Sequence, residues 1–432
     1  MDGSSFRVII VGGSIAGLSL AHCLHKAGID CIILEKRRKI VQSDGGFVGV
    51  LPNGGRILEQ LGLYAAVEKL IEPMRRFHLQ FPDGFHFSHS YPQDVHDQFG
   101  YPMAFLGRQQ LLQILYESLP RPPIIHVSKT VTHIEQQDNT VLVYTRDGSK
   151  YTGDLVVGAD GVHSRVRTQM WRIADTLQPG LITDQEKRIK IDYACIFGTS
   201  TAVPGLNLGR LHLTVCDGHS FILAPAPQAR LSWFIVIKLN RQYRYGAAPC
   251  FSTADADAWC EQRADQAIWA DVTFEQVWKN RETIAMVPLE EKLFQHWHYG
   301  RLVCIGDSVH KMTPNLGQGA NSAIEDAAVL ANEIRDALVG AQNPTSLSDR
   351  AVDALLSRFS TKRLARMTKV YRASKAVVRV QTRQVWLYNL ILRHLVPYSG
   401  SLPAKQVTKI FEDAAALTFV PLPRRGCGAE WS

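Results

Sequence analysis

The sequence predicts an α/β protein whose parallel sheet is interrupted by a sheet-rich insert and followed by a helical C-terminal region. Three short apolar runs, at 6–11, 155–158 and 302–305, each end in a glycine or a Gly/Asp cluster. This pattern is typical of parallel strands whose C-terminal ends face a ligand. Runs rich in β-branched and aromatic residues lie between the last two, at 193–238, and indicate a separate sheet.

The chain length sets the domain organisation. With 432 residues, the protein has room for two or three domains with a buried core. Its 46% hydrophobic and 20% charged content argues against disorder and against repetitive folds. We expect the α/β domain at 1–180 and 290–357, the insert at 181–289 and the C-terminal helical region at 358–432.

The first 35 residues have the pattern of a βαβ unit. The strand at 6–11 runs into Gly12-Gly13-Ser14-Ile15-Ala16-Gly17, a helix follows, and a second strand ends at Glu35. Glycines here let the backbone approach a pyrophosphate at the helix N-terminus, and the carboxylate can accept hydrogen bonds from a ribose. Ser14 takes the place of the usual middle glycine. The pattern predicts a Rossmann-like dinucleotide-binding domain, with a purely structural glycine turn as the alternative.

Two further motifs follow predicted strands. Asp160 lies in Gly158-Ala159-Asp160-Gly161, a sequence that can also form a plain turn. Asp307 follows the strand at 302–305 and can hydrogen-bond a ligand hydroxyl. Gly317-Gln318-Gly319-Ala320 then opens a long predicted helix, whose free N–H groups stabilise negative charge.

These three motifs, in this order, resemble those of the FAD-dependent monooxygenases of the aromatic-hydroxylase type (group A flavoprotein monooxygenases). Three shorter segments, Val11 to Leu18, Pro52 to Leu58 and Phe419 to Pro423, are similar to the fungal PaxM-type branch. Members of that branch epoxidise prenyl chains of indole-diterpenes and meroterpenoids. The resemblance implies FAD as cofactor and NAD(P)H, with NADPH the expected form, as co-substrate.

The resemblance also assigns FAD contacts, position by position. The assigned residues are Gly12, Gly13, Gly17, Glu35, Gly49, Arg108, Asp160, Asp307, Gly317, Gly319 and Ala320. A surface helix cap is the alternative role for Arg108. His310 is expected to be structural, because flavin oxygenation needs no histidine base.

The implied reaction begins with reduction of FAD by NAD(P)H. O2 then adds at the flavin C4a position, and the hydroperoxide gives its distal oxygen to an alkene of a prenylated secondary-metabolite intermediate. Hydroxylation of a phenolic or polyketide ring is the alternative reaction, and a non-catalytic prenyl-binding escort protein is the alternative outside the enzymes. The product distinguishes the two reactions, since one gives an epoxide and the other a phenol.

The oxygenating intermediate survives only where water is excluded, so we expect an apolar site. The insert could line it with Phe197, Leu211, Leu213, Phe221, Leu223, Trp233 and Phe234. An ordinary sheet core would have the same sequence pattern.

The prediction of a catalytic donor depends on one difference from the PaxM-type branch. The branch often has a tyrosine after a valine of the insert, where this chain has Cys216. Because a thiol is a weak hydrogen-bond donor, we expect either Tyr193 to take over the role or the reaction to need no donor.

Charge and targeting patterns bear on the partners. Of the net charge of +8, the segment 358–393 supplies ten Lys/Arg and no Asp or Glu, which argues against a nucleic-acid partner. This basic helix either packs on its own domain or makes a peripheral membrane contact.

The N-terminus has no signal-peptide pattern, so we expect a cytoplasmic protein. If the basic helix makes a membrane contact, we expect the protein on the cytosolic face of an internal membrane. The eight cysteines lack zinc-site spacing and are expected to be reduced thiols.

Overall fold

The computed structural model describes residues 6–41, 46–119, 124–206, 209–244, 246–342 and 345–425. The first five residues, which bear on the targeting prediction, and Cys427 lie outside the described residues. All seven cysteines of the described part are free thiols.

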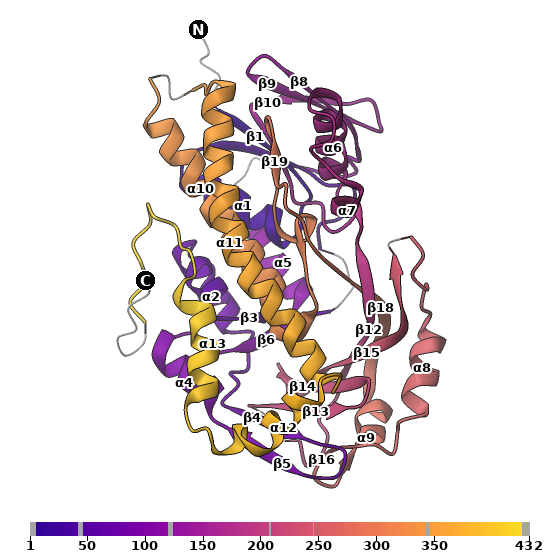
Figure 1. Ribbon diagram of the computed structural model, residues 1–432. Helices are drawn as coiled ribbons and strands as arrows, with labels where there is room; N and C mark the ends of the chain where they lie inside the picture. The colour runs from indigo at the N-terminus through magenta and orange to yellow at the C-terminus, as the bar shows by residue number, and fades with distance from the viewer. Residues whose placement is uncertain are drawn as a thin grey trace.

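A six-stranded sheet in the order β19-β20-β11-β1-β2-β7 forms the first layer of the molecule (Figure 1). Its strands are β1 (Arg7–Val11), β2 (Asp30–Leu34), β7 (Ile125–His126), β11 (Leu155–Gly158), β19 (His298–Tyr299) and β20 (Leu302–Cys304). Val8 pairs with Leu155, and Val156 pairs with Leu302, both in parallel register. Among the described strand pairs of this sheet, only the edge strand β19 runs antiparallel to its neighbour β20. These pairings confirm the predicted parallel sheet. Its strands are apolar runs in the sequence because such a sheet is buried on both faces.

Helices cover this sheet. They are α1 (Ile15–Lys26), α5 (Arg108–Glu117), α6 (Arg165–Leu177), α10 (Gln318–Val339) and α11 (Asp349–Gln381). Residues 15–24 of α1 are all buried, since α1 packs between the sheet, α5 and α10. Small residues at the helix contact, such as Ala21, Ala327 and Ala331, are fully buried and allow the helices to approach closely.

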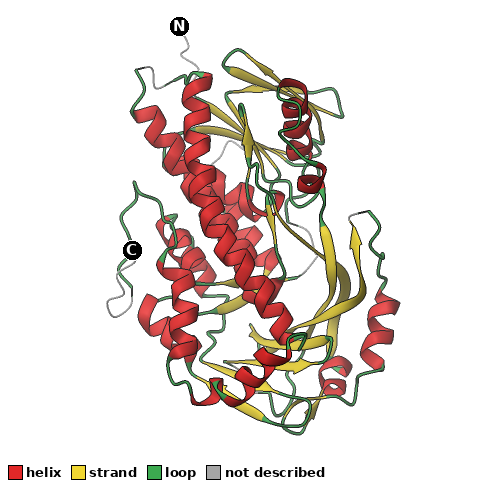
Figure 2. Cartoon of the chain, viewed as in Figure 1, coloured by secondary structure: helices red, strands yellow, loops and turns green. Residues whose placement is uncertain are grey.

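An eight-stranded sheet in the order β21-β18-β12-β15-β14-β13-β4-β5 forms the second body (Figure 2). Its strands are β4 (Arg76–Gln80), β5 (His86–His89), β12 (Lys190–Ser200), β13 (Arg210–Cys216), β14 (His219–Ala226), β15 (Arg230–Arg244), β18 (Arg281–Leu293) and β21 (His310–Lys311). The runs at 193–238 form strands of this sheet, as predicted, but the sheet extends beyond the predicted insert. β4 joins it through parallel pairing with β13, in which Arg76 lies opposite Arg210. Backbone hydrogen bonds at the sheet edge thus recruit a segment that lies far before the insert in the chain.

Smaller elements complete the fold. They are α2 (Pro52–Gln60), α3 (Tyr64–Glu68), α4 (Tyr91–Phe99), α7 (Asp184–Lys187), α8 (Thr253–Glu261), α9 (Phe274–Lys279), β3 (Phe47–Val50), β6 (Ala104–Gly107), β8 (Val131–Gln137), β9 (Thr140–Thr145), β10 (Lys150–Gly153), β16 (Ala267–Trp269), β17 (Val272–Thr273), η1 (Gly306–Ser308) and η2 (Pro314–Leu316). β8, β9 and β10 form a separate three-stranded sheet, and β3 pairs with β6.

The helix α11 runs from beside the first sheet to the eight-stranded sheet (Figure 1). It continues into α12 (Trp386–His394), η3 (Val396–Tyr398) and α13 (Leu402–Glu412). No described helix is long and apolar enough to cross a membrane.

Part of the basic charge of α11 is neutralised inside the protein. Arg363 binds Glu325 and Asp326 of α10, each at 2.7 Å, and Arg366 binds Glu325 at 2.5 Å. Burial raises the pKa of Glu325, yet the two arginines hold it below its ordinary value. Along this part of its length α11 packs on its own domain, which is the first of the two predicted alternatives.

Candidate active site

A cavity of about 1430 Å³ lies between the two sheets and the C-terminal helices. Ligand pockets usually measure about 300–1,000 Å³, so this cavity has room for a large cofactor and a second ligand. One part, here called the cofactor limb, is lined by Val11, Gly12, Ser14, Glu35, Arg108, Asp160, Asp307 and Gly317 to Ala320. The other, here called the substrate limb, is lined by Phe77, Leu79, Phe87, Leu211, Leu213, Ile222 and Phe234.

The first glycine motif forms a turn that only glycine can fill. Gly12 has a φ of +108°, and a Cβ atom there would lie 2.4 Å from the carbonyl oxygen of Ala159. A Cβ atom on Gly17 would lie 2.0 Å from the carbonyl oxygen of Gly12. Gly12 itself lines the cavity, whereas Gly13 and Gly17 are absent from the described lining and support the turn from behind. The glycines therefore shape the start of α1, where free N–H groups face the cofactor limb.

Glu35 lies at the end of β2, where the sequence places the ribose-binding acid. Its Oε2 accepts a hydrogen bond from the Gly13 N–H at 2.7 Å, and its Oε1 accepts one from the Arg37 N–H at 2.8 Å. A carboxylate has about four lone-pair sites, so each oxygen keeps one for a ligand hydroxyl. The two backbone bonds fix the carboxylate at the wall of the cavity.

Arg108 and Ser14 meet across the cofactor limb. Arg108 begins α5 and donates from Nη2 to the Ser14 Oγ at 2.8 Å. Arg108 also lines the cavity. The contact also gives a reason for serine at the middle position of the glycine motif, because glycine has no side chain to bind the guanidinium.

Asp160 lines the cavity and also supports the helix behind it. Its Oδ2 accepts hydrogen bonds from the N–H groups of Arg165 and Val166, at 2.6 and 3.2 Å. Burial raises the pKa of Asp160, although these hydrogen bonds oppose the shift. Arg167, in the first turn of α6, donates to the carbonyl oxygens of Val162 and Ser308 and thereby ties the second motif to the third.

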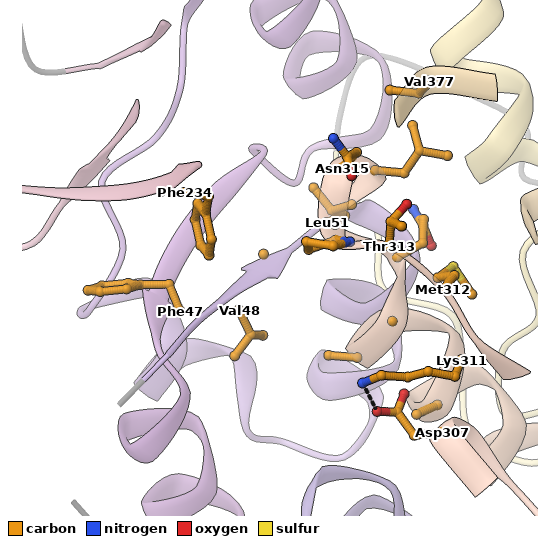
Figure 3. A pocket seen from close by; sticks show the side chains of 18 of the residues that line it. Phe47, Val48, Leu51, Phe234, Asp307, Lys311, Met312, Thr313, Asn315 and Val377 are labelled. Carbon is orange, nitrogen blue, oxygen red and sulfur yellow. Dashed lines mark hydrogen bonds and ion pairs between the residues drawn. The ribbon is translucent and has the colours of Figure 1, made fainter. Parts of the chain in front are cut away.

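Asp307 and Lys311 form an ion pair at the wall of the cavity, shown by the dashed line in Figure 3. The Lys311 Nζ lies 2.5 Å from the Asp307 Oδ2. Burial raises the pKa of Asp307, but Lys311 outweighs this effect and holds the pKa below its ordinary value. The carboxylate is therefore ionised and can accept hydrogen bonds from a hydroxyl-bearing ligand.

The start of α10 brings the remaining predicted contacts into the same cavity. Gly317 has a left-handed φ of +63°, and Gly317, Gly319 and Ala320 all line the cavity. Gly49 lies across from them on β3, where a Cβ atom would come 3.7 Å from the Gly317 backbone. Backbone N–H groups at this helix start can stabilise negative charge on a bound ring or phosphate.

Asn321 holds these two loops together, a role that the sequence analysis missed. Its Nδ2 donates to the carbonyl oxygens of Gly49 and Gly317, at 2.9 and 2.7 Å, and its Oδ1 accepts from the Leu51 N–H. Gly49 precedes Asn321 by 272 residues, so no local spacing reveals the contact.

The substrate limb is one face of the eight-stranded sheet. Because side chains alternate along a strand, Phe234 lines the cavity while its neighbour Trp233 packs on the opposite face, in a core with α8 and α9. Of the seven predicted lining residues, Leu211, Leu213 and Phe234 line the cavity. The prediction was wrong for Phe221, Leu223 and Trp233, which pack in the core on the opposite face of the sheet. Phe197 is also absent from the described lining.

The two predicted catalytic residues, Tyr193 and Cys216, lie outside the described cavity lining. The Tyr193 hydroxyl is fully buried and accepts a hydrogen bond from Gln384 Nε2 at 2.8 Å. Cys216 packs in the core on the opposite face of the sheet, and burial raises the pKa of its thiol to about 12. His310, predicted to be structural, is buried and bonds to Asp326 at 2.6 Å.

The chain matches the FAD binding domain family over residues 5–177 and 199–374. The chain belongs to this family of FAD-dependent monooxygenases. It is 49% identical to the FAD-dependent monooxygenase spyC of Aspergillus fumigatus, over 97% of this chain and 89% of the relative. It is 45% identical to the FAD-dependent monooxygenase olcE of Penicillium canescens, over 100% of this chain and 93% of the relative.

The fold is also that of a solved FAD-binding protein. HpxO of Klebsiella pneumoniae, solved with FAD and uric acid, has a TM-score of 0.76 at 22% identity, covering 94% of this chain and 95% of HpxO. The cofactor limb fits FAD in three respects. The glycine turn leaves space for a pyrophosphate, Glu35 can bind the adenosine ribose, and Asp307 with the start of α10 can bind the ribityl chain and flavin ring.

Proposed function

We propose that this FAD-dependent monooxygenase uses NAD(P)H and O2 to epoxidise an alkene of a prenylated secondary-metabolite intermediate, such as a meroterpenoid or an indole-diterpene. FAD, when bound, supplies the electron transfer from NAD(P)H and the activation of O2. The residues of the chain bind and orient the two ligands and exclude water.

The apolar character of the substrate limb supports an isoprenoid substrate. Seven apolar side chains from β13, β14, β15 and the β4–β5 hairpin line it, among them the aromatic rings of Phe77, Phe87 and Phe234. Phe234 and Phe47 lie beside one another on the same side of the cavity in Figure 3. Such a wall excludes water and gives a prenyl chain an apolar surface to bind.

His89 is the cavity-lining histidine of β5, and its hydrogen bonds support epoxidation over ring hydroxylation. This histidine lines the cavity, but its Nε2 donates to the Gly400 carbonyl oxygen at 2.6 Å, and its Nδ1 accepts from the Tyr91 N–H at 3.0 Å. Both ring nitrogens are therefore occupied by backbone groups, and the imidazole cannot take a proton from a phenol. An isolated alkene needs no such base.

A cationic rim supports a phosphate-bearing coenzyme such as NADPH. Exposed Lys36, Arg37, Arg146 and Arg165 all line the outer end of the cofactor limb. Guanidinium and ammonium groups bind phosphate through charge-assisted hydrogen bonds.

Turnover by the FAD-loaded protein in air tests the proposal. We expect a farnesylated meroterpenoid or a geranylgeranyl-indole to stimulate NADPH oxidation and to gain one oxygen atom in an acid-labile product. A product hydroxylated on its aromatic ring would establish the alternative reaction instead. Flavin binding without stimulation by either prenylated compound would reject the prenyl substrate class.

A further inference from the structure

Exposed apolar side chains gather on one short stretch of the C-terminal region. Eight of the fourteen exposed large hydrophobic residues of the described chain fall within residues 386–402. We call this stretch the α12 surface, and its exposed apolar members are Trp386, Leu387, Tyr388, Leu390, Ile391, Leu395, Tyr398 and Leu402. Monomeric proteins seldom expose such a contiguous group unless it binds something.

The α12 surface is also the outer wall of the cavity. Tyr388, Ile391, Leu395 and Leu402 are exposed at the surface and line the cavity at the same time. Leu392, on the inner side of α12, packs in the same apolar cluster as the substrate-limb residue Phe87. An unbroken apolar path therefore leads from the surface into the substrate limb.

The charges around the α12 surface select one kind of partner. The sequence from 354 to 411 contains no Asp or Glu, and Lys405 and Lys409, which follow Leu402 on α13, are exposed. Arg383, just before α12, pairs with Asp217, and Arg393, in the last turn of α12, pairs with Asp83. Aromatic and aliphatic side chains bordered by cations match the headgroup region of an anionic bilayer, which takes up Trp, Tyr and Leu and attracts Lys.

The geometry of α12 fits an interfacial position. The helix has nine residues, about 14 Å at 1.5 Å per residue, and a bilayer core is about 30 Å thick. None of its residues is buried, so its outer side is available to lipid.

We propose that the α12 surface docks this protein on an anionic lipid bilayer and places the mouth of the substrate limb at the membrane, where an apolar substrate dissolves. The docking is inferred from the exposed residues and charges of the α12 surface, and it does not depend on the proposed reaction. The delivery of substrate from the bilayer rests on the proposed function.

Vesicle sedimentation with the full-length FAD-loaded protein tests the docking without any turnover. The probes are vesicles of phosphatidylcholine with 30% phosphatidylserine, about a third anionic lipid as suits this electrostatic contact, and vesicles of phosphatidylcholine alone. We expect binding to the anionic vesicles that weakens as salt rises.

The test variant is the double substitution Trp386→Asp and Leu390→Asp, since neither residue lines the cavity. We expect a loss of vesicle binding of about tenfold or more, because each buried apolar side chain contributes on the order of a tenfold change in partition. The matched control is Leu177→Asp with Val339→Asp, which are 69% and 72% exposed on other helices. Flavin content and NADPH oxidation with detergent-dispersed substrate should stay within about twofold of wild type in both variants, because neither pair touches the cavity.

Three outcomes would overturn the proposal. The wild-type protein could fail to sediment with the anionic vesicles, or the control could lose binding as much as the test variant. The wild-type protein could also be a dimer that the test variant converts to a monomer, which would assign the α12 surface to a second copy of the chain. If the aspartate variant does not fold, Lys405→Glu with Lys409→Glu takes its place, and unchanged binding by that folded variant would equally contradict the proposal.

Discussion

The cofactor limb and the substrate limb are built in different ways. In the cofactor limb, glycines and backbone N–H groups form most of the binding surface. Side chains are excluded at Gly17, where a Cβ atom would lie 2.0 Å from a carbonyl oxygen. In the substrate limb, side chains of the sheet form the wall, and their alternation decides which residue faces the cavity. We therefore expect substitutions in the first limb to affect FAD binding and substitutions in the second to affect substrate binding or stability.

The largest effect on flavin binding should come from Gly17→Ala. The new methyl group collides with the Gly12 carbonyl oxygen and comes 3.2 Å from Ile10, so the turn and α1 cannot keep their positions. We expect almost complete loss of bound flavin, measured by its absorbance, and a loss of folding stability of about 1–3 kcal/mol. Gly319→Ala is the control, because nothing lies within 4 Å of the place that its methyl group would take, and apo stability should stay at the wild-type value. Wild-type flavin content in Gly17→Ala would refute the role of this turn.

Two neighbouring residues test the substrate limb. Trp233→Ala empties a space in the opposite core and removes the hydrogen bond from the indole N–H to Ser200, so it should cost about 3–5 kcal/mol of unfolding free energy. Phe234→Ala opens the cavity wall and should cost less stability while it raises the KM for the apolar substrate. Denaturant unfolding and steady-state kinetics on both variants measure the difference. Equal effects of the two substitutions on stability and KM would contradict the assignment of the two faces.

The next effect concerns Glu35. Glu35→Ala removes a carboxylate that can bind the ribose with charge-assisted hydrogen bonds worth about 1.5–3 kcal/mol. This corresponds to a loss of FAD affinity of about ten- to a hundredfold, measured by quenching of flavin fluorescence. Glu35→Gln should lose less, because the amide oxygen can still accept one hydrogen bond. Unchanged affinity in the alanine variant would place the ribose elsewhere.

The smallest effect is a pH dependence of folding stability, which arises in the sheet that forms the substrate limb. His78 and His212 stack at 5.0 Å on the face opposite the cavity, and burial, together with the nearby charges of Arg76, Arg210 and His86, lowers their pKa values to about 4 and about 3. The folded state holds both rings neutral, whereas the unfolded chain takes up protons below about pH 6.5. The free energy of unfolding therefore decreases as the pH drops from about 6.5 toward the folded pKa values.

The replacement His212→Phe tests this sign. It should reduce the loss of stability between pH 6.5 and pH 5, by about 2 kcal/mol for one histidine. Thermal unfolding at both pH values measures the change, and an unchanged pH slope in the variant would exclude His212 as its source.

The sequence by itself determined the cofactor limb. The strand, the glycine turn and Glu35 are neighbours in the chain, so local geometry and backbone chemistry leave few arrangements for them. The same holds for Asp307 and the start of α10, which lie within one segment. These motifs indicated the family before any contact was known.

Only the tertiary structure decided which residues form the substrate limb. Strand alternation is readable in the sequence, but the face that covers the cavity depends on where the sheet packs, so Phe234 and Trp233 could not be told apart. Asn321 and the β4–β5 hairpin act through partners far away in the chain, and the buried Tyr193 hydroxyl accepts a hydrogen bond from the distant Gln384. Contacts between distant segments leave no local spacing, and for that physical reason the site's walls appear only in the folded chain.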